Sequence, residues 1–115
     1  LENMPALLKT YYLQINNDKK GLKTMFEKDK ERMLGFKDWS DEQLKSIRAP
    51  TFLMIGEHDV VTPEHALRMS HLIPNSQLKI LPGTHGSFIG EISSEQEGSK
   101  MPEITVAIIQ EFLNK

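Results

Sequence analysis

The sequence contains no cysteine. This absence excludes disulfides, thiolate nucleophiles and cysteine-ligated zinc, and it is typical of proteins in a reducing compartment. We therefore expect a cytoplasmic location.

The sequence also lacks long apolar runs and an excess of positive charge. No apolar stretch approaches the roughly 20 residues that a bilayer-spanning helix needs, and no signal peptide is visible. The sequence has 14 basic and 16 acidic residues, so its net charge is −2. It contains no run of basic residues. We expect a soluble protein with no membrane span and no nucleic-acid partner.

The 115 residues, of which 38% are hydrophobic and 26% charged, suit one domain or part of a larger one. The first part predicts helices. Asn3 is a candidate cap for a first helix, residues 22–34 have helical apolar spacing up to Gly35, and Ser40 with Gln43 forms a capping box.

From Pro50 onward the pattern becomes that of an α/β protein. Thr51 to Ile55 is a continuous apolar run, typical of a strand covered on both faces. Thr62 and Pro63 open a helix, and residues 77–81 form the next strand. Strand, helix and strand in about thirty residues predict a parallel βαβ unit. A last helix is expected near Pro102.

Two residues that can carry acid–base chemistry follow these strands. Asp59 comes after the first strand and His85 after the second, 26 positions later. Because loops leaving the carboxyl ends of parallel strands lie at the same edge of a sheet, we expect the carboxylate and the imidazole to meet. An Asp that holds a His is two-thirds of a nucleophilic triad.

Three segments resemble the C-terminal third of an α/β-hydrolase-fold enzyme. They are residues 47–66 (IRAPTFLMIGEHDVVTPEHA), 73–76 (IPNS) and 81–86 (LPGTHG). The resemblance implies a partial α/β-hydrolase fold in which Asp59 is the triad acid and His85 the triad base. It assigns residues 1–46 to a helical cap or lid and residues 47–115 to the C-terminal part of the core.

The nucleophile of such an enzyme is missing from the sequence. No G-x-S-x-G motif occurs, and the nearest string, Gly86 to Gly90, has Ser87 in its second position. The resemblance therefore implies a Ser upstream of Leu1, in a parent enzyme that hydrolyses an ester-like small molecule without a cofactor. We expect this chain alone to be inactive.

Two other interpretations remain open. The chain could be a non-catalytic binding or assembly module, because fold alone does not confer activity. A metal-dependent phosphohydrolase using His58 and Asp59 is weaker, since His65 and His71 are six apart and face different sides of a helix. We expect no metal site and read His58 and His65 as solvated surface residues.

The predicted sheet is unusually small. Parallel sheets need both faces covered and usually have several strands, whereas this chain offers two. The missing strands could come from sequence outside the chain or from a second copy. We expect the chain by itself to self-associate.

Overall fold

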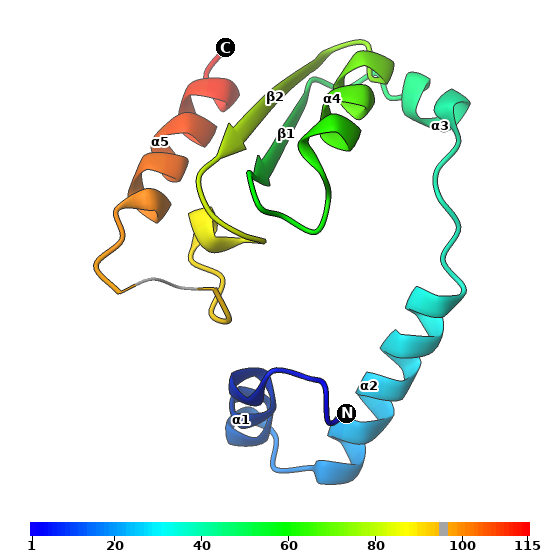
Figure 1. Ribbon diagram of the computed structural model, residues 1–115, viewed down its shortest axis with the longest axis vertical. Coiled ribbons are helices and arrows are strands. Elements are labelled where there is room, and N and C mark those ends of the chain that lie inside the picture. Colours follow the sequence, from blue (N-terminus) through cyan, green and yellow to red (C-terminus); the bar gives the residue numbers. More distant parts are fainter. Residues whose placement is uncertain (95–96) are drawn as a thin grey trace. The chain divides into compact units, whose positions relative to one another are not determined.

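The computed structural model describes residues 1–94 and 97–115 (Figure 1). These residues form a mixed α/β protein with five α-helices and a two-stranded parallel sheet. Their contacts divide the chain into two compact units, Leu1–Asp38 and Trp39–Lys115. Within the described residues, no helix combines the length and the apolar character needed to cross a bilayer.

The first unit consists of helices α1 (Ala6–Ile15) and α2 (Lys19–Leu34). The cap predicted at Asn3 is wrong, because α1 begins after Pro5, whose ring fixes a φ compatible with entry into a helix. Helix α2 begins three residues before the predicted start, since the Asp18 side chain accepts a hydrogen bond from the Gly21 N–H at 2.9 Å. Leu22 is the buried residue of this unit.

The second unit is built on strands β1 (Thr51–Gly56) and β2 (Ser76–Leu81), joined by helix α4 (Pro63–Leu72). The strands run parallel, with Thr51 opposite Ser76 and Gly56 opposite Leu81. The predicted βαβ unit is therefore confirmed. The predicted start of helix α4 is also confirmed, since the Thr62 side chain accepts a hydrogen bond from the His65 N–H.

Helices α4 and α5 (Met101–Leu113) flank the two strands (Figure 1). Ala66 and Ile73 are buried at the α4 side. The Phe112 ring of α5 stacks on the Phe52 ring, with 5.0 Å between the ring centroids. The residues Thr51–Ile55 are nevertheless only half-buried. The run is typical of a strand covered on both faces, but two helices cover only part of a two-stranded sheet, as expected for a chain that offers so few strands.

Helix α3 (Asp41–Lys45) belongs to the second unit. Its predicted capping box is confirmed: the Ser40 hydroxyl accepts from the Gln43 N–H, and the Gln43 side chain accepts from the Ser40 N–H. Asp41 then pairs with Arg68 of α4 at 2.7 Å. The helical segment expected over residues 1–46 thus extends across the boundary between the two units.

One buried group in α5 lacks a partner. Thr105 is 1% exposed, and its hydroxyl has no hydrogen-bond partner among the residues that the structure describes. A buried hydroxyl without a partner costs free energy, because it has given up its hydrogen bonds to water.

We expect Thr105→Val to raise the free energy of unfolding by about 1 kcal/mol, because valine has nearly the same shape and no hydroxyl. Thr105→Ser is the matched control: it keeps the hydroxyl, removes the methyl group and should destabilise the protein. Thermal unfolding followed by circular dichroism measures both. A Thr105→Val protein less stable than the parent would show that the hydroxyl has a stabilising partner.

Candidate acid–base site

The site lies where the two parallel strands end. Gly56 is the last residue of β1 and stands opposite Leu81, the last residue of β2. Beyond the strands, the Glu57 N–H donates to the Leu81 carbonyl at 2.8 Å and the His58 N–H to the Gly83 carbonyl at 3.0 Å. Main-chain hydrogen bonds therefore join the two loops where they leave the sheet.

Gly56 allows the loops to approach this closely. A Cβ atom at this position would lie 2.6 Å from the carbonyl oxygens of both Gly83 and Thr84. These are main-chain atoms, so relief would require the second loop to move as a whole. Any residue with a side chain at position 56 would separate the loop that carries Asp59 from the loop that carries His85.

The predicted acid–base pair is confirmed in its geometry. The Nδ1 atom of His85 lies 2.8 Å from Oδ1 of Asp59. The Asp59 side chain is 6% exposed and the His85 side chain 70% exposed. The carboxylate is thus buried under the imidazole, which presents the rest of its ring to solvent.

Three donors converge on the Asp59 carboxylate. Besides the His85 ring, the Gly56 N–H donates to Oδ2 at 3.2 Å and the Val60 N–H donates to Oδ1 at 2.7 Å. Burial by itself would raise the pKa of Asp59, but the hydrogen bonds from His85, Gly56 and Val60 outweigh it and lower the pKa below its ordinary value of 3.8. The carboxylate is therefore ionised near neutral pH.

An ionised Asp59 fixes the tautomer of His85. A carboxylate only accepts hydrogen bonds, so the proton of a neutral imidazole must reside on Nδ1. The Nε2 lone pair is then free and directed away from the carboxylate. This is the arrangement in which an imidazole can take a proton from a nucleophile and later return it.

Two other residues singled out in the sequence do not join this pair. The His58 side chain is 75% exposed, and its Nε2 lies 3.7 Å from a carboxylate oxygen of Glu57. In residues 1–94 and 97–115, no group of three His, Asp or Glu side chains is placed to hold a metal ion. The Ser87 hydroxyl donates to the Thr84 carbonyl at 3.0 Å, so its proton is directed at the main chain.

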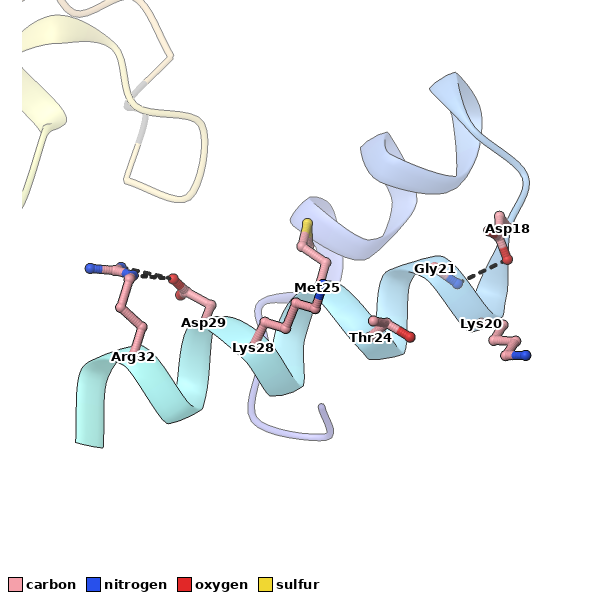
Figure 2. A pocket seen from close by; sticks show the side chains of 8 residues that line it. All are labelled: Asp18, Lys20, Gly21, Thr24, Met25, Lys28, Asp29 and Arg32. Carbon is pink, nitrogen blue, oxygen red and sulfur yellow. Dashed lines mark hydrogen bonds and ion pairs between the residues drawn. The ribbon is translucent and has the colours of Figure 1, made fainter. Parts of the chain in front are cut away.

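Two hollows of the surface lie apart from the pair. A small cavity beside the two loops is lined by Glu57, His58, Gly83 and the start of α5, without Asp59 or His85. Figure 2 shows an open depression along α2, with Asp18 bonded to Gly21 at one end and Asp29 paired with Arg32 at the other. It lies wholly within the first unit and contains none of the predicted catalytic residues.

Comparison of the chain with protein-family models, with curated proteins and with solved structures finds no match.

Several residues that build the site were not singled out in the sequence. Gly56 belongs to a segment that carries the family resemblance, but its contact with the second loop depends on the register of the strands, which the sequence alone does not show. Glu91, Ser93 and Ser94 lie in a polar stretch with no motif, yet the Ser94 hydroxyl donates to the His85 carbonyl at 2.8 Å.

We expect the pKa of Asp59 to lie below the usual range of aspartic acid and to rise in His85→Ala, which removes the hydrogen bond that lowers this pKa most. The side-chain carbonyl ¹³C shift of Asp59, followed by NMR from neutral to acid pH, measures both values. His58→Ala is the control and should leave the titration unchanged.

The same shift predicts a dependence of stability on pH. Because the pKa is lower in the folded state, the ionised carboxylate contributes stability in full above the unfolded pKa. This contribution is lost as the pH falls through the folded pKa. An Asp59 pKa at or above its ordinary value would contradict the buried, three-donor arrangement.

Proposed function

We propose that this chain supplies the acid and the base of a nucleophilic triad, as the C-terminal part of an α/β-hydrolase that cleaves an ester-like small molecule. The observation that carries the proposal is the 2.8 Å hydrogen bond from the exposed His85 ring to the buried Asp59 carboxylate, at the carboxyl end of two parallel strands. The order of acid before His along the chain agrees with this family.

The proposed reaction uses a hydroxyl nucleophile from outside these 115 residues. Nε2 of His85 takes the hydroxyl proton as the oxygen attacks the ester carbonyl, and Asp59 stabilises the imidazolium that forms. The imidazolium then gives its proton to the departing alcohol, which leaves an acyl-enzyme. Water, activated by the same Nε2, releases the acid and restores the nucleophile.

The remaining parts of the proposal concern the cap and the setting. Residues 1–46 would form the helical cap, whose exposed Leu7, Tyr11 and Met25 offer apolar surface to a substrate. Residues 47–115 would complete the hydrolase core. The reaction needs no cofactor, and the absence of cysteine agrees with the cytoplasm as its compartment.

In the polypeptide that contains the nucleophile, we expect His85→Ala to abolish hydrolysis of an activated ester. Asp59→Asn should lower kcat by about 10⁴-fold while the fold stays intact, because the amide favours the wrong tautomer of His85. His58→Ala is the matched control in the same loop and should change kcat little.

The 115-residue chain alone should show no esterase activity. Hydrolysis by this chain that a serine-directed inhibitor abolishes would contradict the assignment of the nucleophile. Full activity of both His85→Ala and Asp59→Asn would favour a non-catalytic role for the pair. Loss of activity on chelation and in His58→Ala, with Asp59→Asn tolerated, would favour the metal-dependent alternative.

We also propose that the chain by itself associates through the outer edge of β1. The Thr51 and Glu57 N–H groups point to β2, and the alternation of a strand turns the N–H groups of Phe52 and Met54 to the other edge. Within the described residues, no strand pairs with that edge. Such an edge is a template for pairing with a second chain.

Light scattering should give a mass above that of the monomer, most simply that of a two-fold dimer. Met54→Pro removes an N–H that faces outward and spares the bonds to β2, so it should shift the mass toward the monomer. Met54→Ala is the control for the loss of the side chain and should still associate. A parent chain that remains monomeric at high concentration would contradict the association.

A further inference from the structure

The segment after His85 folds back on itself. Gly86 has a left-handed conformation with φ of 69°, and its carbonyl accepts a hydrogen bond from the Glu91 N–H at 3.0 Å. A Cβ atom on Gly86 would lie 2.7 Å from Cβ of Glu91. The turn therefore depends on glycine at this position. It brings residues 91–94 against the main chain of the candidate base.

The main-chain carbonyls from Gly83 to Gly86 all accept hydrogen bonds, but one differs in its donor. The carbonyls of Gly83, Thr84 and Gly86 accept from main-chain N–H groups, namely those of His58, of Ser87, and of Ile89 and Glu91 respectively. Among the described residues, the His85 carbonyl accepts only from a side chain, the Ser94 hydroxyl at 2.8 Å.

Glu91 holds Ser94 in place. The Glu91 carboxylate accepts two hydrogen bonds from Ser93, one from its hydroxyl and one from its N–H at 3.0 Å. The Ser94 N–H donates to the Glu91 carbonyl at 3.0 Å. The Ser94 hydroxyl also lies 3.2 Å from the carboxylate, but a hydroxyl has one proton, and the His85 carbonyl is the nearer acceptor.

The charge of Glu91 suits this role. The hydrogen bond from the Ser93 side chain contributes most to a lowered pKa of Glu91, and the bond from the Ser93 N–H contributes next. The Glu91 carboxylate is therefore ionised near neutral pH. An ionised carboxylate accepts without donating, so it holds the turn of residues 91–94 in one arrangement.

We propose that Ser94 is a positioning residue for His85, held by Glu91, and that it fixes the peptide of the base so that the imidazole meets Asp59. The proposal rests on the proposed function, because it gives a role to the residues that orient the base. The His85 side chain is 70% exposed, so few side-chain contacts fix its ring. The direction of the ring therefore depends on its hydrogen bond to Asp59 and on the main chain from which it projects.

NMR of the 115-residue chain tests the proposal without any need for catalysis. In mildly alkaline solution, where histidine is largely neutral, the ¹⁵N shifts of the two ring nitrogens report which one carries the proton. The parent chain should hold His85 in the Nδ1–H form. In Ser94→Ala, this form should fall from the major to a minor population, with shifts approaching those of the exposed His58.

Two variants serve as controls. Ser94→Thr keeps the hydroxyl and should restore the Nδ1–H form. Ser87→Ala removes a serine hydroxyl from the same loop. The Thr84 carbonyl, which accepts from that hydroxyl, still accepts a hydrogen bond from the N–H of residue 87. This variant should therefore leave the His85 tautomer unchanged. The amide spectrum of β1, β2 and α4 verifies that each variant is folded.

Glu91→Ala provides a second, independent test. It should reduce the Nδ1–H form as Ser94→Ala does, and the double variant should show no further loss, because Glu91 acts through Ser94. An unchanged His85 tautomer in folded Ser94→Ala or in folded Glu91→Ala would overturn the proposal. So would a failure of Ser94→Thr to restore the tautomer.

These outcomes are separate from those of the activity measurements. A fixed His85 tautomer that requires Ser94, in a protein whose nucleophile-bearing form hydrolyses no ester, would refute the proposed reaction and keep the positioning role. An active enzyme in which Ser94→Ala leaves the His85 tautomer unchanged would refute the positioning role and keep the proposed reaction.

Discussion

The close approach of two main chains at Gly56 is the constraint on which the site depends. The loop after β1 and the loop after β2 touch through main-chain atoms, with no side chain between them. Hydrogen bonds from Glu57 to the end of β2 and from His58 to Gly83 in the second loop then continue the pairing beyond the last residue of β1. Asp59 and His85 lie close together because main-chain hydrogen bonds join their two loops at the residues just before them.

The pair is asymmetric in its exposure to solvent. Asp59 is buried and receives three hydrogen bonds, two of them from the main chain of its own loop. Main-chain N–H groups of Gly56 and Val60 therefore hold the carboxylate on the side away from the His85 ring as well as beside it. The imidazole, in contrast, lies mostly in solvent, so its orientation depends on the carboxylate and on the peptide that carries it. A buried carboxylate thus orients an imidazole whose ring is open to solvent.

The sequence predicted the features that follow from local patterns. The apolar runs and the Thr62 cap mark the parallel βαβ unit, the Ser40 capping box marks α3, and the strand ends bring Asp59 and His85 together. Features that depend on non-local contacts were not predictable. Asn3 is a good cap by type, but Pro5 sets the start of α1. The burial of Thr51–Ile55 depends on how many strands the sheet has, and the partner of the His85 carbonyl depends on where a polar loop returns.

The separation of 26 positions between Asp59 and His85 has a consequence for folding. Asp59 and His85 follow consecutive strands that are joined by a single helix, so their contact needs only one βαβ unit. Because the entropy cost of closing a loop grows with its length, this contact costs less to close than one with an element farther away in the sequence. The two loops that carry the pair can therefore come together once one βαβ unit has folded, before any element that lies farther away in the sequence has taken its place.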